Sequence, residues 1–249
     1  MAKDDAKKKG TPGRRPRTTG RETGASPARL PSGRHGLDPN YVVKNQRERI
    51  IAAIAQTVAE LGGRSATTED MVRAARVSRR TFYDLFESRD EAYLATYLEI
   101  NTRVYERVAA AFLAAESGPD KLRGCLAAFL DYMASEPDFA YMAIVDVLSA
   151  GADVLQQRDQ LLRRFVALVD QSGLVGPDDE IPMLASEAVV GGIYEVVYKR
   201  ILAGETAQLR ELLPELYYYC LVPFLGRSEG RRLYLEFLDE RGSSASAAG

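Results

Sequence analysis

The sequence has 249 residues, of which 46% are apolar and 27% charged, and its formal net charge is −2. This is the composition of a globular protein, and the length allows one large domain or two small ones. No apolar run approaches the ~20 residues that span a bilayer, and no apolar segment follows the basic N-terminal residues as in a secretory signal. We therefore expect a cytoplasmic protein with no membrane partner.

Two cysteines and one histidine exclude much of the chemistry of metal sites and nucleophilic enzymes. A zinc site of Cys and His ligands would lack partners, and a Ser-His-Asp or Cys-His mechanism would rest on His35 in a segment rich in Gly, Pro and Arg. Cys125 and Cys220 lie in apolar helical runs, where free cysteine behaves as a small hydrophobe. We expect buried reduced thiols, no metal, no cofactor and no catalytic residue.

Charge is distributed unevenly along the chain. Residues 1–36 contain ten lysines and arginines against three acids, a charge of +7, so the remaining 213 residues carry −9. This segment is rich in glycine and proline and cannot bury enough apolar surface to offset the entropy cost of ordering. The sequence therefore predicts a disordered basic arm over residues 1–40. Such an arm could contact DNA phosphates or a minor groove, and a purely solubilising tail is an equal alternative.

Three helices are predicted between residues 41 and 86. An apolar residue recurs every three or four positions from Ile50 to Leu61, and Gly62-Gly63 ends this first helix. The run Thr67–Asp70 has a capping-box pattern that opens a short second helix. Ser78 is a good N-cap for a third helix over Arg79–Phe86. A long helix followed by two short helices around a tight turn has helix-turn-helix spacing.

The third helix has the composition of a DNA-recognition helix, because arginines, a threonine and a tyrosine crowd its first turns. Arginine bonds the O6 and N7 acceptors of guanine in bidentate fashion, while hydroxyl groups reach phosphates. The starts of the second helix and of the long helix after Ser88 add backbone N–H groups for phosphates. A solvated basic face is the alternative. The predicted DNA-binding residues are Thr67, Thr68, Ser78, Arg79, Arg80, Thr81, Tyr83 and Arg89.

The stretch Asn45–Tyr97 resembles the DNA-binding domain of TetR-type transcriptional regulators. The matching residues are Leu61-Gly62, Thr68, Val77-Ser78, the run Thr81–Phe86, Arg89 where the family usually has Lys, and Leu94. The sequence departs from the family pattern at Arg76 and Arg80, where Gly is common, and at Met71-Val72, which replace a usual Ile-Ala pair. The resemblance implies a double-stranded DNA operator as partner and a ligand-responsive regulator, most often a repressor.

The rest of the chain is predicted to form further helices, because apolar and polar residues show no sustained alternation of the kind that indicates β-strands. The expected fold class is all-α: an N-terminal three-helix helix-turn-helix DNA-binding domain plus a C-terminal helical ligand-binding and dimerisation domain. The predicted divisions are the basic arm (1–40), the DNA-binding domain (41–95), the effector-binding and dimerisation domain (96–228), and a short C-terminal helix with a disordered tail (229–249).

Two late helices, one after residue 182 and one containing Leu216, are apolar on more than one face, as expected for helices buried on more than one side. We expect this pair to form a homodimer interface with its copy, in which Gly191-Gly192 allows close backbone approach. A deeply buried pair within one monomer is the alternative. The last two long helices do dimerise in the regulators that this chain resembles. The residues expected at the interface are Val190, Gly191, Leu216 and Tyr219.

The middle helices offer the lining of an apolar cavity with hydroxyl groups, as small-molecule sites usually have. The candidate lining residues are Phe112, Phe129, Met133, Tyr141, Met142, Val145, Phe165 and Tyr194. Each of them taken singly is also compatible with plain core. The resemblance implies that a small apolar or amphipathic effector releases the operator by tilting the long helix Arg89–Ala115, since a ligand must favour one spacing of the DNA-binding domains.

Two other classes of function compete with a regulator. A helical enzyme could use Asp131, Asp146 and Glu187, acids in apolar helices, as general bases. The sequence contains neither a Glu-x-x-His metal motif nor a Gly-rich phosphate loop to support it. A helical protein–protein adaptor with no specific DNA site is the second alternative.

Overall fold

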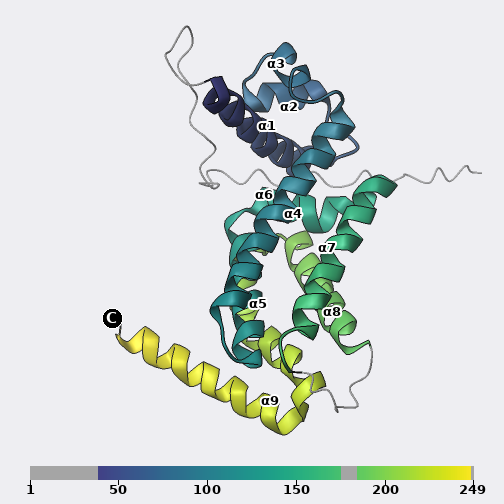
Figure 1. The fold of residues 1–249 in the computed structure, drawn as a ribbon. Helices are drawn as coiled ribbons and strands as arrows, with labels where there is room; N and C mark the ends of the chain where they lie inside the picture. The colour runs from purple at the N-terminus through teal and green to yellow at the C-terminus, as the bar shows by residue number, and fades with distance from the viewer. Residues whose placement is uncertain (1–38, 175–183, 248–249) are drawn as a thin grey trace, which may run out of the picture.

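The computed structural model describes residues 39–174 and 184–247, and every regular element in these two ranges is helical. The predicted all-α fold class is confirmed for this part of the chain. A small N-terminal unit stands on a larger helical body, and the long helix α4 runs from one into the other (Figure 1). The predicted arm lies outside the described residues, apart from Pro39 and Asn40, with which α1 already begins.

The N-terminal unit consists of α1 (Pro39–Leu61), α2 (Thr68–Ala75), α3 (Arg79–Tyr83) and the first turns of α4 (Arg89–Ala114). The apolar face of α1 forms its core, since Ile50, Ile54 and Val58 are fully buried. The buried face of α1 ends at Val58, because Leu61, the last residue of the helix, is 49% exposed. Gly62, which follows, has a φ of +80° and ends the helix. The third helix is shorter than the predicted Arg79–Phe86.

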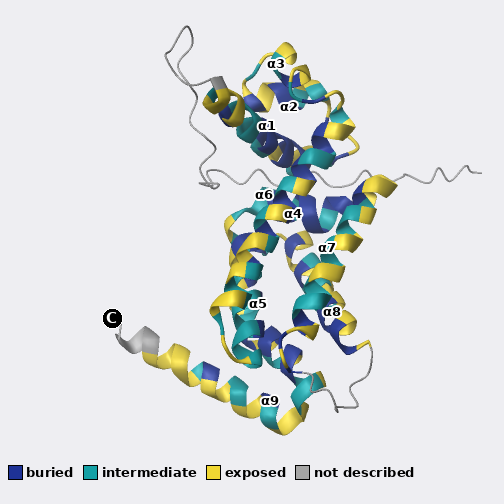
Figure 2. Ribbon diagram, viewed as in Figure 1, coloured by how far each residue is buried: buried dark blue, intermediate teal, exposed yellow. Residues whose placement is uncertain are grey.

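The body is built from α5 (Gly118–Ser135), α7 (Ala152–Asp170), α8 (Ala185–Leu202), α9 (Leu213–Ala247) and the C-terminal part of α4. The α5 and α7 helices pack on α4, while α8 packs on α7 and α9 packs on α5 and α8. A short 3₁₀ segment, η3 (Thr206–Leu212), leads from α8 into α9. The buried residues follow the faces where these helices meet (Figure 2). None of the helices in the described ranges combines the length and the apolar character needed to cross a membrane.

The segment between α5 and α7 is irregular, although its apolar residues suggested one helix. It divides into α6 (Pro137–Ala140), a π-helical turn η1 (Tyr141–Val145) and a 3₁₀ turn η2 (Asp146–Ser149). A π turn contains more residues per turn than an α-helix, so the side chains after it are redirected. This segment lies where α1, α4 and α8 meet, at the junction between the N-terminal unit and the body.

The last helix, α9, bends sharply at Gly226, whose φ of 74° and ψ of 171° are not helical. After the bend the helix continues to Ala247, well beyond the short piece expected around Leu233–Leu238. Phe237 explains part of this extension, because it is buried and stands edge-on to Tyr217 with ring centroids 5.6 Å apart. Arg232 adds an i,i+4 ion pair with Glu236 at 2.6 Å, of the kind that supports an exposed helix.

Candidate functional site

The α3 helix presents polar side chains to solvent and anchors itself through one aromatic ring. Phe82 is fully buried and contacts Phe86 with ring centroids 5.6 Å apart. Arg79, Arg80 and Tyr83 are exposed, Tyr83 to 47%, and the Tyr83 ring stands edge-on to Phe82 with centroids 5.4 Å apart. Arg80 lies 3.9 Å from Asp84, whereas Arg79 makes no ion pair with any described residue. The structure therefore brings three of the predicted DNA-binding side chains together on one open surface.

Two of the hydroxyl groups expected to contact DNA, those of Thr67 and Ser78, cap helices. The Thr67 Oγ1 accepts from the N–H of Asp70 at 3.2 Å, and the Asp70 carboxylate accepts from the N–H of Thr67 at 3.1 Å. The hydrogen bond from the Thr67 side chain also lowers the pKa of Asp70. The Ser78 Oγ accepts from the N–H of Thr81 at 3.0 Å and lies 2.8 Å from Thr81 Oγ1. These groups therefore fix the starts of α2 and α3, with Thr68 half-buried beside them.

The turn between α2 and α3 contains a residue in the left-handed conformation. Arg76 has a φ of 52° and a ψ of 43°, and no other non-glycine residue in the described ranges has a positive φ. The Nη2 of Arg49 on α1 donates to the carbonyls of Ala75 at 2.5 Å and Arg76 at 3.2 Å, which satisfies the C-terminal end of α2. The backbone thus adopts here the geometry that glycine takes without strain.

Replacing Arg76 by glycine is expected to raise the free energy of unfolding by about 0.5–1 kcal/mol. A non-glycine residue pays about 1–2 kcal/mol in this region, and the larger entropy of glycine in the unfolded chain offsets part of the gain. Urea unfolding measures the difference. Arg76→Ala is the control, because it removes the guanidinium but keeps the Cβ, and it should give no gain. Equal stability of the two variants would contradict the prediction.

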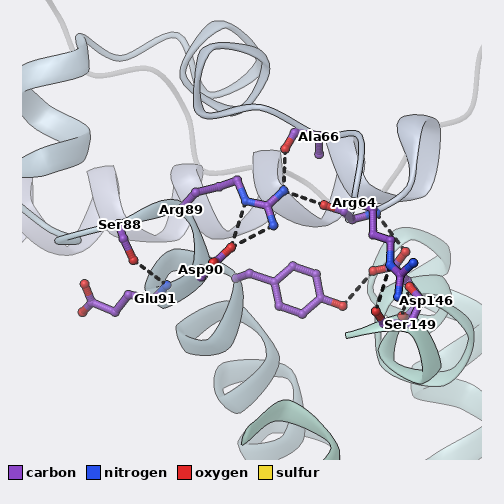
Figure 3. Close-up of polar contacts among 10 residues, drawn as sticks. Arg64, Ala66, Ser88, Arg89, Asp90, Glu91, Asp146 and Ser149 are labelled. Carbon is purple, nitrogen blue, oxygen red and sulfur yellow. Dashed lines mark hydrogen bonds and ion pairs between the residues drawn. The ribbon is translucent and has the colours of Figure 1, made fainter. Parts of the chain in front are cut away.

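The guanidinium of Arg89 is committed to contacts within the protein (Figure 3). Its Nη1 donates to the carbonyl oxygens of Gly63 at 2.7 Å and Ala66 at 2.9 Å, while Nε and Nη2 donate to the Asp90 carboxylate at 3.0 and 2.8 Å. These bonds hold the loop between α1 and α2 against the first turn of α4. Arg89 therefore has a structural role, and a contact with DNA would have to use the remaining face of the guanidinium.

A buried carboxylate joins the N-terminal unit to the body. Asp146 of η2 accepts from the N–H of Gly63 at 2.8 Å and from the Tyr93 hydroxyl at 2.8 Å (Figure 3). Burial and the nearby charge of Asp146 raise the pKa of Tyr93, so its hydroxyl keeps the proton that it donates. A Cβ on Gly63 would lie 2.3 Å from the Asp146 carboxylate, which explains glycine at this position. The Nε of Arg64 adds a long contact of 3.4 Å to the carbonyl of Ser149.

The body contains a partly open cavity of about 100 Å³. It lies between α4, α5, η1, α7 and α8, and nearly all of its lining is apolar. Four of the eight residues proposed from the sequence line it, namely Phe129, Met133, Phe165 and Tyr194. This cavity is the strongest candidate for a small-molecule site in the described part of the chain.

The other four proposed residues, Phe112, Tyr141, Met142 and Val145, do not line the cavity. The Phe112 ring lies elsewhere, 5.1 Å from the Lys121 ammonium. The remaining three belong to the π turn η1, where the altered period turns Ala143 and Ile144 toward the cavity instead. The sequence prediction assumed the α-helical period of 3.6 residues, so it could not show which side chains of a π turn face the cavity.

One end of the cavity is polar, and sequence reasoning identified only one of the four residues that make it so, Tyr194. Tyr97 and Asn101 come from α4, Arg158 from α7 and Tyr194 from α8. The Arg158 Nε donates to the Tyr194 hydroxyl at 3.2 Å, and that hydroxyl donates to the carbonyl of Ile144 at 2.8 Å. Asn101 and Arg158 each interrupt the apolar face of a helix, α4 and α7 respectively. A polar residue at such a position is the sequence signal that could have identified them.

The four residues expected at a dimer interface divide into two groups. Val190 and Leu216 are buried within the single chain, where Val190 lines the cavity, whereas Gly191 and Tyr219 are exposed. A Cβ on Gly192 would lie 2.5 Å from the Tyr219 hydroxyl, so this glycine serves a contact between α8 and α9 of one chain. A Cβ on Gly191 would meet no atom within 4 Å.

The cysteines and acids singled out from the sequence lie apart from one another. Both thiols are free, and burial raises the pKa of Cys125 to about 11 and that of Cys220 to about 12. Asp131 pairs with Arg210 at 2.7 Å on the surface, Asp146 is the buried junction residue, and Glu187 is exposed on α8. The described residues contain no group of three or more His, Cys, Asp or Glu that could hold a metal ion.

Comparison with known proteins gives a clear answer for the fold alone. No family model and no curated protein matches the sequence. Among solved structures, the fatty acid degradation regulator FadR from Bacillus halodurans superposes with a TM-score of 0.64 at 18% identity, covering 71% of this chain and 94% of that one. FadR from Bacillus subtilis, solved with stearoyl-CoA, gives 0.61 at 17% identity, covering 72% and 97%.

A TetR family transcription regulator from Marinobacter aquaeolei VT8 gives a TM-score of 0.60 at 17% identity, covering 74% of this chain and 97% of that one. All three are matched over nearly their whole length, so the similarity includes both the N-terminal unit and the helical body. The chain therefore has the fold of the TetR family of transcriptional regulators.

Proposed function

We propose that this protein is a sequence-specific DNA-binding transcriptional regulator, and that it acts as a repressor released by a small effector. The observation that carries the proposal is the surface of α3, where Arg79, Arg80 and Tyr83 are exposed around the buried anchor Phe82. An arginine without an ion-pair partner at the start of a recognition helix is available for a base contact in the major groove. The fold and the names of its structural neighbours support the same assignment.

The effector site in this proposal is the cavity between α4, α5, α7 and α8. An apolar cavity with a few polar groups at one end is typical of small-molecule sites. FadR from Bacillus subtilis was solved with stearoyl-CoA, which supports an effector with an apolar portion for a protein of this fold. We assign to this site the cavity residues Phe129, Met133, Phe165 and Tyr194 from the sequence prediction.

The route from the cavity to the DNA-binding surface passes through η1 and η2 in this proposal. Ile144 lines the cavity and accepts a hydrogen bond from Tyr194, and two residues later Asp146 holds Gly63 and Tyr93 of the N-terminal unit. An effector changes DNA affinity only if it favours one arrangement of this junction over another. Displacement of η1 by a ligand would move the carboxylate that fixes the loop between α1 and α2.

The regulator is proposed to act as a homodimer through α8 and α9, with the exposed Gly191 and Tyr219 at the contact. Gly191→Ala is then expected to weaken the dimer about tenfold, because a methyl group placed in a close helix contact costs about 1–3 kcal/mol. The change should leave the single chain intact, since its Cβ meets nothing within 4 Å. Sedimentation over a concentration series measures the effect. Gly151→Ala, at another open glycine that lies before α7 and outside α8 and α9, is the control and should leave dimerisation unchanged.

Selection of genomic DNA fragments with the purified protein, followed by affinity measurements over a salt series, tests the proposed function. A regulator should enrich a two-fold symmetric site with half-sites about 34–36 Å apart and show a steep fall of affinity with salt. Weak binding without enrichment of any sequence would refute the proposal and favour the adaptor alternative.

A further inference from the structure

The polar end of the cavity contains an unsatisfied hydrogen-bonding group beside a cation. Asn101 is 7% exposed, and its Oδ1 has no hydrogen-bond partner among the described residues. A buried polar atom without a partner costs about 1–3 kcal/mol, so a site of this kind calls for a ligand group. The Asn101 side chain is hydrogen-bonded to that of Tyr97, and both residues line the cavity.

Arg158 supplies the cation. Its Nε donates to Tyr194, its Nη1 donates to the Asp159 carboxylate at 2.9 Å, and its guanidinium carbon lies 4.4 Å from the centre of the Tyr194 ring. These contacts orient the guanidinium, while Nη2 has no hydrogen bond to any described residue. Arg158 lines the cavity, and an oriented guanidinium with an N–H group to spare beside an apolar cavity is suited to a carboxylate.

The Asn101 amide can complete such a site. Rotation about its terminal torsion exchanges the amide oxygen and nitrogen, so that Oδ1 accepts from the Tyr97 hydroxyl and Nδ2 donates into the cavity. Burial raises the pKa of Tyr97, which therefore keeps the proton needed for this arrangement. Asn101 and Arg158 then offer two donors from α4 and α7 to one anionic group.

The size of the cavity limits the rest of the ligand. Its volume of about 100 Å³ is well below the roughly 300–1,000 Å³ of ordinary small-molecule pockets. Benzene marks the upper limit for the apolar body of a ligand, because the cavity that benzene is known to occupy is larger, about 150 Å³. Phe129 and Phe165, whose ring centroids are 6.2 Å apart, form the apolar wall.

We propose that the cavity binds a small carboxylic acid as its carboxylate, which is held by Arg158 and Asn101 while the short apolar body lies against the aromatic side chains of α5 and α7. This assignment deepens the proposed function and rests on it for its regulatory meaning. The carboxylate would also lie beside Tyr194, whose hydroxyl is bonded to the carbonyl of Ile144 in η1.

Calorimetric titration of the full-length protein with hexanoate, hexan-1-ol and hexanoyl-CoA tests the proposal. Hexanoate should bind at least tenfold more tightly than hexanol, which has the same body without the charge. Arg158→Gln should reduce hexanoate affinity at least tenfold, whereas Arg163→Gln, an exposed arginine on the same helix, should leave it unchanged. Arg158→Lys, which keeps the charge without the planar fork, should retain part of the affinity.

Equal binding of hexanoate and hexanol by the unaltered protein would overturn the proposal, even if Arg158→Gln failed to fold. Hexanoyl-CoA that binds more tightly than hexanoate and is insensitive to Arg158→Gln would overturn it as well, because the ligand head would then be a thioester held elsewhere. These titrations contain no DNA. Hexanoate binding without any enriched DNA site would therefore refute the proposed function while leaving the ligand assignment in place.

Discussion

Substituting both Arg79 and Tyr83 with alanine is expected to abolish specific operator binding while leaving weak, salt-dependent binding to any DNA. A bidentate arginine–guanine pair contributes about 1–3 kcal/mol of discrimination in each half-site. A dimer loses that contribution twice, so Arg79→Ala alone should weaken binding to the selected site by at least about 30-fold. The measurement is fluorescence anisotropy on the selected fragment and on a scrambled one.

Two controls make this result specific. Arg231→Ala removes an exposed arginine on α9 and should leave both affinities unchanged. Urea unfolding of the Arg79→Ala, Tyr83→Ala variant should show a loss of at most about 1.5 kcal/mol, because Arg79 is exposed and Tyr83 loses only its edge-on contact with the Phe82 ring. Operator binding that survives the double substitution would refute the assignment of α3 as the recognition helix.

Asp146→Ala is expected to lower the free energy of unfolding by about 2–4 kcal/mol. The change leaves the N–H of Gly63 and the hydroxyl of Tyr93 buried and unpaired, and each such group costs about 1–3 kcal/mol. Tyr93→Phe, which removes one of the two bonds and keeps the carboxylate on Gly63, should cost about 1 kcal/mol. Asp153→Ala is the control, since this acid is exposed at the start of α7 and should change little.

A double-substitution cycle isolates the contact itself. Gly63→Ala places a methyl group 2.3 Å from the Asp146 carboxylate and should be strongly destabilising in the unaltered protein. In the Asp146→Ala background the obstructing oxygen is gone, so the same change should cost at least 1 kcal/mol less. Additive effects of the two substitutions would show that Gly63 and Asp146 do not interact as described.

Local signals in the sequence were sufficient to predict the helices of the N-terminal unit. The hydroxyls of Ser78 and Thr67 accept from backbone N–H groups three residues later, and Ile50, Ile54 and Val58 recur at helical spacing on one buried face. Both patterns lie within a short stretch of sequence, so they can be recognised without knowing the tertiary structure. Arg76 was recognised as a departure from the family pattern at the turn, and its left-handed backbone is the conformation that such a position requires.

The junction and the polar end of the cavity could not be predicted in the same way. Gly63 and Asp146 are 83 residues apart, and only the packing of the N-terminal unit on η2 brings them together. The choice of large aromatic side chains as cavity residues succeeded for Phe129 and Phe165 but overlooked Asn101 and Arg158. Asn101 and Arg158 indicated the polar end of the cavity better than the aromatic residues did, because a polar group on an apolar helix face needs a hydrogen-bond partner there.

The loop between α1 and α2 also determines whether the N-terminal unit can be separated from the body. Its carbonyls bind Arg89 of α4 and its amide binds Asp146 of the body, so a cut after residue 95 would leave Gly63 and Tyr93 without their acceptor. The N-terminal unit is consequently incomplete as an isolated fragment, although its four helices suggest an independent module. The two parts of the chain should melt in one cooperative transition, and the same bonds couple the proposed DNA-binding surface of α3 to any rearrangement of the body.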